Sequence, residues 1–218
     1  MNIEELLLAD CRRLAAKGLL CSIDDSYSLR IPGEEKMLLV SGLEDWQKID
    51  GRHMRRCLFL ERDYPAALHA AIYQNRGDVG AIAVSSPCGV RLVAEFGGVL
   101  PTLFDEQARH IGGSARSIPD RTPASNKQLG KVLRRGDNGV LFGSQLLCLG
   151  MTSERVIFNT ELVEKCARAY VIARAAGRPI KCIPWWVRLI AKRRLMKDER
   201  NAAISYSRGL KPDNVGGY

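Results

Sequence analysis

A run of small and apolar residues over positions 79–85, with helical segments on both sides, constrains the fold of this chain more than any other feature. Its length and composition are typical of a strand buried on both faces of a sheet. The segment before it, residues 67–73, has helical character and ends at the turn Arg76-Gly77-Asp78. Pro87 then begins a second helix, a position that proline tolerates well. A helix, a buried strand and a helix in succession predict an α/β fold.

Other segments supply the rest of the predicted sheet and its cover. The hydrophobic pattern predicts strands over 27–31, 36–41, 57–60, 139–142 and 146–149, and helices from residue 3 and over 65–76, 105–111, 123–133 and 153–176. Short turns join several of these strands as hairpins, for example at Pro32-Gly33. We therefore predict a three-layer α/β/α architecture with a mainly antiparallel central sheet.

Positive charge is concentrated at the C-terminal end. The chain has a net charge of +9, and residues 178–218 hold ten Lys and Arg against three Asp and Glu, which is +7 of that total. This shift in composition divides the chain into a domain over residues 1–177 and a basic, Trp-containing extension over 178–218.

Cysteine usage and hydropathy indicate the compartment. Seven cysteines, an odd number and never spaced as C-x-x-C, are typical of reduced thiols rather than a disulfide framework. The N-terminus predicts an amphipathic helix and not a secretory signal, and no apolar run approaches the roughly 18–20 residues of a membrane span. We expect a cytoplasmic protein that has no cofactor.

Several motifs occur in an order that points to one family. Ser28-Leu29-Arg30 is followed by Ser41-Gly42-Leu43, a loop and helix lead to Gly112, and Asn138-Gly139 begins a hairpin before the long helix over 153–176. Over about residues 3–177 the chain resembles the class II aldolase/adducin family. The resemblance implies the α/β/α fold, a homo-oligomer and, in the family's enzymes, zinc held by three histidines beside a catalytic glutamate.

The positions that match the zinc site carry other residues. In the family a His-x-His step ends the central strand, so that both rings lie on one face, and a third histidine comes from the last hairpin. Here these positions are Val84, Ser86 and Ser144, and the glutamate position, four residues before His69, is Pro65. Valine has no ligand atom, and serine is a poor substitute for imidazole. The sequence therefore argues against a zinc aldolase.

The positions that match the family's phosphate site have also changed. The serine pair before the glutamate is Asp63-Tyr64, and the glycine-rich turn is Ile23-Asp24-Asp25-Ser26, which places acid where an anion would bind. Ser41 and Gly42 remain as the matching hairpin end. We expect a vestigial phosphate site at Ser41, Gly42, Asp63 and Tyr64, and a solvated turn or helix cap at Asp24-Asp25, where a divalent cation is the weaker alternative.

A few residues keep an active enzyme open as an alternative. His69, Asp63, Glu106 and His110 are the candidates for a relocated base, and His69 with Cys88 and Cys148 for a replacement metal site. For His69 we favour a partly buried side chain satisfied by a backbone acceptor. For His110 we favour a surface or subunit contact.

The extension predicts an amphipathic helix over about 183–196. Its candidate partner-binding residues are Trp185, Trp186, Arg188, Arg193 and Arg194, and such a pattern suits an acidic partner or an anionic membrane surface. We favour the simpler interpretation, in which the apolar side packs on the domain or on a neighbouring subunit. In the family's enzymes C-terminal residues of a neighbouring subunit reach the active site, and the resemblance implies that Arg188, Arg193, Arg194 or Tyr206 faces the vestigial cleft in the same way. Charge confined to a tail argues against nucleic acid.

Together these features predict a catalytically degenerate aldolase-like protein with a binding or scaffolding role. One alternative is a lyase that acts on a small phosphorylated sugar or hydroxy-acid through a relocated metal or base. The other is a peripheral membrane or partner-binding protein that acts through the basic C-terminal helix.

Overall fold

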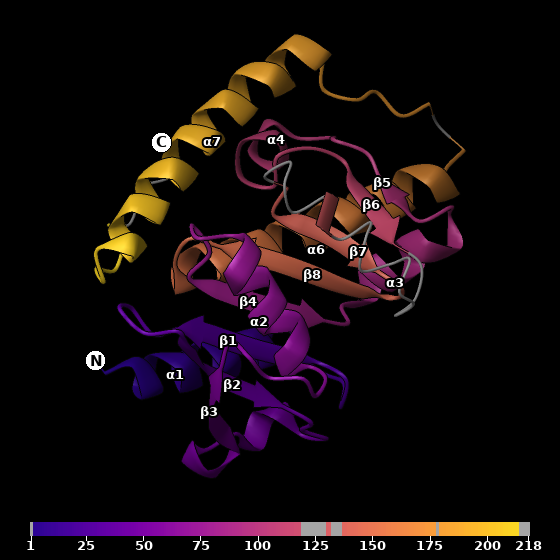
Figure 1. Cartoon of the computed structure of the whole chain (residues 1–218). Coiled ribbons are helices and arrows are strands. Elements are labelled where there is room, and N and C mark those ends of the chain that lie inside the picture. The colour runs from indigo at the N-terminus through magenta and orange to yellow at the C-terminus, as the bar shows by residue number, and fades with distance from the viewer. Residues whose placement is uncertain (1, 119–129, 132–136, 178, 214–218) are drawn as a thin grey trace.

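The computed structural model describes residues 2–118, 130–131, 137–177 and 179–213, and Figure 1 shows the whole chain. The described helices are α1 (Ile3–Ala16), α2 (Ala66–Asn75), α3 (Cys88–Glu95), α4 (Asp105–His110), α6 (Ser153–Ala175) and α7 (Trp185–Ser207), with short 3-10 turns at Trp46–Lys48 and Gly51–His53. The strands are β1 (Ser26–Arg30), β2 (Lys36–Ser41), β3 (Met54–Leu58), β4 (Ala81–Ser85), β5 (Val99–Leu100), β6 (Ala115–Ile118), β7 (Gly139–Phe142) and β8 (Gln145–Gly150).

The strands form one mixed sheet. Its order within the described residues is β3-β2-β1-β4-β8-β7-β6-β5, so the predicted buried strand β4 lies near the centre. Neighbours pair antiparallel, with the exception of β6 and β7, which run parallel. The predicted sheet was therefore correct in class, but the parallel pair makes it mixed. This pair was missed because β5 and β6 have only two and four residues.

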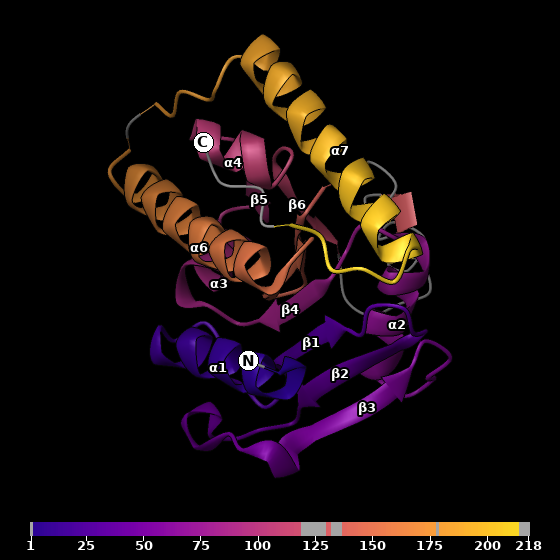
Figure 2. The same cartoon turned by 90° about the vertical axis from the view of Figure 1, so that its left-hand side faces the viewer.

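Two apolar clusters, one on each face of the sheet, make up the core. Residues of α1, α3 and α6 pack on one face with alternate residues of the central strands, while α2 packs on the other face with Ile82 and Val84 of β4. Figure 2 shows the sheet between α2 and the group of α1, α3 and α6. The three-layer arrangement follows from β4, whose five residues are all buried and which therefore needs cover on both sides.

Several predicted boundaries moved. The strand expected over 57–60 lies at Met54–Leu58, because its pairing with β2 fixes the register. The expected helix over 123–133 lies almost entirely outside the described residues. The C-terminal helix is longer than predicted, and it lies across α4 at the edge of the molecule (Figures 1 and 2).

Candidate functional site: the vestigial cleft at the end of β4

Val84, at the first position of the family's histidine pair, is part of the apolar core. Its side chain is fully buried, and its backbone pairs with Ser26 of β1 and Leu147 of β8. The side chain packs in the cluster that lies under α2. An apolar side chain in this place stabilises the core and offers no electron pair to a metal.

Ser86, at the second position, belongs to a buried hydrogen-bonded network. Its Oγ donates to Oδ1 of Asp25 at 2.7 Å, and Nε2 of Gln145 lies 3.4 Å from both of these oxygens. The Gln145 amide also donates to the carbonyl oxygen of Asp24 at 3.1 Å. Three segments far apart in sequence therefore meet where β4 ends and β8 begins.

Asp25 is the centre of this network. Its second oxygen, Oδ2, accepts the backbone N–H groups of Cys21 and Ser22 at 2.7 and 2.9 Å. The residue is fully buried, and burial raises the pKa of its carboxyl although the bonds from Ser86, Cys21, Ser22 and Gln145 lower it. The prediction of a solvated turn holds for exposed Asp24 and is wrong for Asp25. Because donors occupy both oxygens of Asp25, the weaker alternative of a cation site gains no support.

A cavity of about 410 Å³ opens beside the network. Ser86 and Gln145 line it together with exposed Ser144 and Arg91, and its remaining lining residues are Ser22, Asp24 and Phe142. The cleft is therefore open, and Val84 and Tyr64 do not line it. The structure brings together two of the predicted positions, Ser86 and Ser144, and adds Gln145 and Arg91, which sequence reasoning missed. Gln145 follows Ser144 directly, so the hairpin turn was the available signal.

The predicted phosphate-site positions do not line this cavity. Ser41 ends β2 and Gly42 follows it, and Asp63 and Tyr64 are exposed in the loop before α2. Pro65 stands at the N-cap of α2, where its carbonyl accepts the His69 N–H. A proline at this position removes the proton-transfer group that the resemblance implies.

His69 is held by hydroxyl groups away from the cavity. Nε2 lies 2.9 Å from Oγ of Ser26, and Nδ1 lies 2.7 Å from Oγ of Ser28. The ring is fully buried, and burial lowers its pKa to about 3, so the imidazole is neutral. It was expected to be partly buried with a backbone acceptor; instead it is fully buried between two serines. Both ring nitrogens are in use, so His69 has none left for a substrate.

The structure separates the members of the alternative metal site. Cys148 packs in the cluster under α6, whereas His69 contacts the β1 serines from α2 on the other face of the sheet. Among the residues that the structure describes, no group of three or more His, Cys, Asp and Glu side chains is arranged to hold a metal ion.

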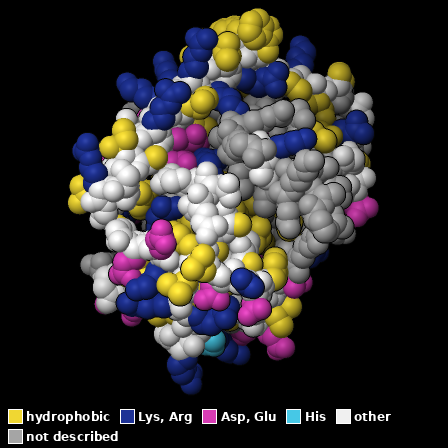
Figure 3. Space-filling view, in the orientation of Figure 1, with side chains coloured by type: hydrophobic (Ala, Val, Ile, Leu, Met, Phe, Trp, Pro, Cys, Tyr) yellow, Lys and Arg dark blue, Asp and Glu magenta, His cyan; other side chains and the backbone are white. Residues whose placement is uncertain are grey.

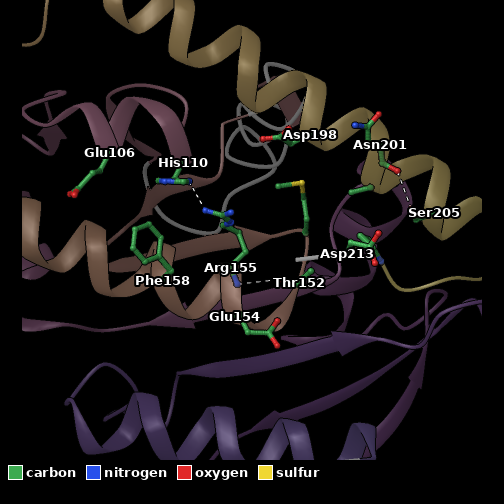
Figure 4. Close-up of a pocket in the computed structure, with 13 residues that line it drawn as sticks. Glu106, His110, Thr152, Glu154, Arg155, Phe158, Asp198, Asn201, Ser205 and Asp213 are labelled. Atoms are coloured by element: carbon green, nitrogen blue, oxygen red, sulfur yellow. Dashed lines mark hydrogen bonds between the residues drawn. The ribbon is translucent and has the colours of Figure 1, made fainter. Parts of the chain in front are cut away.

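Glu106 and His110 lie at a different and larger cavity, of about 740 Å³, between α4, α6 and α7 (Figure 4). Nδ1 of His110 lies 2.5 Å from Nη1 of Arg155, and the ring packs edge-on against Phe158. Burial, and then the charges of Arg155 and Arg109, lower the pKa of His110 to about 4. The expected surface position is wrong, because this side chain is buried. Neither residue lines the cavity at Ser86.

Buried charges fix the C-terminal helix to the domain. Arg76 donates through Nε and Nη2 to Asp78 at 2.7 and 2.6 Å, and through Nη2 to Glu199 of α7 at 3.1 Å. Asn138 joins them, because its Oδ1 accepts from Arg76 and its Nδ2 donates to Glu199. Burial, before any charged neighbour, raises the pKa of Glu199 to about 7. We name Arg76, Asp78, Asn138 and Glu199 the α7 clamp.

Tyr206 packs at the other end of β4 from the vestigial cleft. Its hydroxyl donates to the Met151 carbonyl at 2.9 Å and lies over Gly80, where a Cβ would come within 1.8 Å of it. Among residues 179–213, the described part of the extension, none lines the cavity at Ser86. Within one chain these residues therefore do not face the vestigial cleft; a contribution from a neighbouring subunit stays a prediction.

Known proteins share features of this sequence and of its fold. The sequence model of the class II aldolase and adducin N-terminal domain matches residues 5–171. The chain belongs to this family. The match ends before the extension, and the division of the chain at residue 177 stays a prediction. No curated protein matches the sequence.

Solved structures share the fold at low sequence identity. An L-fuculose 1-phosphate aldolase aligns with a TM-score of 0.74 at 20% identity, over 89% of this chain and 96% of its own. YgbL from Klebsiella pneumoniae aligns with a TM-score of 0.73 at 16% identity, over 87% and 97%. An L-fuculose 1-phosphate aldolase from Glaciozyma antarctica aligns with a TM-score of 0.70 at 15% identity, over 97% and 92%.

Proposed function

We propose that this protein is a catalytically degenerate member of its family, which binds a ligand or partner and performs no zinc-dependent aldol chemistry. The observation that supports this most strongly is the Ser86–Asp25–Gln145 network, because Ser86 stands at one of the family's zinc-ligand positions and core-packed Val84 at another. Ser86 is hydrogen-bonded to Asp25 and Gln145, and Val84 has no atom that could bind a metal.

The donor set does not fit zinc. A catalytic zinc site takes three protein ligands, from histidine, cysteine or carboxylate, and keeps one position open. Val84 has no side-chain atom that can bind a metal. The Ser86 hydroxyl donates a hydrogen bond to Asp25, which already accepts hydrogen bonds from two backbone N–H groups. Metal binding through Oδ1 of Asp25 would have to displace its hydrogen bonds with Ser86 and Gln145, and binding through Oδ2 those with Cys21 and Ser22.

The cavity retains the means to bind a small polar molecule. Ser22 and Ser144 offer hydroxyls, Gln145 an amide, and Arg91 a positive charge at a rim shared with Asp24. A hydroxylated compound matches this lining better than an apolar one, because most of its partners donate or accept hydrogen bonds.

The lyase alternative has less support. A general base must come within hydrogen-bond reach of its substrate, directly or through a water molecule. His69 is fully buried between two serines, and Glu106 and His110 line another cavity. None of the candidates for a relocated base, which also include Asp63, lines the cavity at Ser86.

Assembly and location remain parts of the proposal. Family resemblance supports a homo-oligomer, and the scattered cysteines, all free in the structure, support a reducing cytoplasm. Size-exclusion chromatography with light scattering would measure the assembly directly.

Metal content is the decisive test. Protein purified without chelator and dialysed against trace zinc is expected to contain no stoichiometric transition metal and to cleave no sugar phosphate. The variant V84H/S86H/S144H restores three imidazoles and is expected to gain zinc, which elemental analysis and zinc-dependent thermal stabilisation would detect. Stoichiometric zinc in the unmodified protein would overturn the proposal.

A second variant allows for the risk that histidine is not tolerated at buried position 84. S86H/S144H leaves the Val84 core intact and removes the Ser86 hydrogen bond to Oδ1 of Asp25, so that this oxygen can serve as a third ligand beside the two histidines. S144H alone is the matched control, because it adds one exposed imidazole and should not bind zinc stoichiometrically.

A further inference from the structure

The N-terminal turns of α7 expose a group of large apolar side chains. Trp185 and Trp186 are 69% and 55% exposed, and Leu189 and Ile190 are 44% and 49% exposed. We name these four residues the α7 tip. In Figure 1 this end of α7 stands at the top of the molecule, and Figure 3 shows hydrophobic side chains there beside Lys and Arg. It is convex, and thus unlike a groove that receives a peptide.

The tip is separate from the surface by which α7 packs on the domain. The buried residues of α7 recur at helical spacing, and they are Ala191, Leu195, Glu199, Ala202 and Tyr206. The tip residues precede this stripe and point elsewhere. The apolar side that was expected to pack on the domain is therefore a different set of residues from the two tryptophans.

Acidic and basic residues of α7 also lie on different sides of the helix. Its two acidic residues face the domain, where Asp198 pairs with Arg109 at 2.6 Å and Glu199 with Arg76 at 3.1 Å. The outward side continues from the tip into cations, which are Arg193, Arg194, Lys197 and Arg200. Among the described residues none of these four forms a salt bridge. The outer surface of α7 is therefore apolar at its beginning, and the exposed charges that follow within the helix are cations, with Met196 and Ile204 as further exposed apolar residues.

This distribution of charge favours one kind of binding partner for the α7 tip. A second copy of the chain that docked through its own extension, which holds +7 of the net charge of +9, would meet the cations with like charge. An anionic bilayer attracts them, and tryptophan is the side chain best suited to the boundary between headgroups and acyl chains. A convex apolar tip followed by cations is the arrangement of peripheral proteins that insert shallowly.

We propose that the α7 tip inserts into the headgroup boundary of anionic phospholipid membranes while Arg193, Arg194, Lys197 and Arg200 contact lipid phosphates. The attachment is peripheral. In the part of the chain that the structure describes, no helix combines the length and apolar character that a bilayer crossing needs. This inference is independent of the chemistry at the vestigial cleft.

Intrinsic fluorescence makes the test direct. The chain has three tryptophans, of which Trp46 is 2% exposed in the core and the other two belong to the α7 tip. Full-length protein is mixed with vesicles of phosphatidylcholine alone, or of phosphatidylcholine with phosphatidylglycerol. With the anionic vesicles we expect co-sedimentation, a blue shift of tryptophan emission, and quenching by lipids brominated on the acyl chain. Neutral vesicles should bind at least about tenfold more weakly.

Two variants with matched controls separate insertion from charge. W185A/W186A should lose at least about tenfold in binding, because the inserted apolar area is removed; L60A/I172A, which removes two exposed apolar side chains elsewhere, should not. R193Q/R194Q should bind more weakly and with a smaller salt dependence than R55Q/R62Q, which lacks two exposed arginines on and beside β3.

Each other outcome would overturn the inference. Absence of binding to anionic vesicles at low salt would do so. Binding without a blue shift or quenching would mean electrostatic adhesion rather than insertion. A change in oligomer mass of W185A/W186A by light scattering would identify the tip as a contact between copies. Loss in the control variants equal to that in the tip variants would show a general surface effect.

Discussion

The two ends of β4 hold buried polar groups of different kinds. At its C-terminal end Asp25 is a single carboxylate that accepts from neutral donors beside an open cavity. At the other end the α7 clamp joins the guanidinium of Arg76 to two carboxylates, with little access to solvent. Net stabilisation from neutral hydrogen bonds is modest, whereas a buried charge that loses its partner is costly. The comparison teaches that the Asp25 network should tolerate substitution better than the α7 clamp, because attachment of the extension depends on charge pairing.

Removal of the clamp's only cation should have the largest effect. R76A leaves Asp78, Glu199 and Asn138 buried without their shared donor, and we expect the free energy of unfolding to fall by about 3–5 kcal/mol. Urea denaturation measures it. R52A is the control, because Arg52 pairs with Asp50 on the surface and should cost less than about 0.5 kcal/mol. A loss for R76A no larger than that for R52A would contradict the role of the clamp.

Glu199 should make the contribution of the clamp to stability depend on pH between 4.5 and about 7. Its pKa is raised from 4.5 to about 7, so the folded state favours the protonated form. The stability from this group is fully present below pH 4.5 and is lost as pH rises to about 7. Relative to E199Q, the unmodified protein should lose up to about 3 kcal/mol across this window.

Unfolding measured at pH 4.5, 5.5, 6.5 and 7.5 for both proteins isolates this contribution, since all other groups are shared. Equal pH slopes for the two proteins would show that Glu199 does not titrate there. A reversed difference would mean that its pKa is lowered by Arg76 rather than raised by burial.

Disruption of the Asp25 network should cost less than loss of the clamp. D25N keeps the shape of the side chain but replaces one acceptor oxygen with an NH₂ group. This NH₂ group would face other hydrogen-bond donors in either orientation, the N–H groups of Cys21 and Ser22 or the side chains of Ser86 and Gln145. We expect a loss of about 2 kcal/mol. D24N, at an exposed position, should change stability little. If D25N cost as much as R76A, the two ends of β4 would not differ as described.

The smallest effect should come from the last contact of α7. Y206F removes the hydroxyl that donates to the Met151 carbonyl, and we expect a loss of about 1 kcal/mol. Y170F is the control, because no hydrogen bond of the Tyr170 hydroxyl lies within the described residues. Thermal denaturation would compare the two. An unchanged midpoint for Y206F would show that the clamp, without Tyr206, suffices to hold the helix.

Sequence reasoning succeeded where one local pattern decided the structure. The run over 79–85 predicted β4 as a buried strand, and the alternation of helices and strands predicted the three layers. It failed at β5 and β6, which have too few residues to show a period. It also misjudged Asp25, because an acid in a turn is usually solvated and only the arrival of Ser86 and Gln145 makes its burial favourable.

The sequence by itself determined the family, the layered fold and the absence of histidine at the positions of the zinc ligands, because these depend on local patterns and on residue identity. The tertiary structure decided which polar groups meet. Arg76 and Glu199 are 123 residues apart, and Gln145 and Asp25 are 120 apart, and no pattern of hydropathy encodes such a pairing. It also decided which side of α7 is buried. Helical spacing defines possible faces, but only the surface of the domain selects Ala191 and Leu195 for burial and leaves Trp185 and Trp186 in solvent.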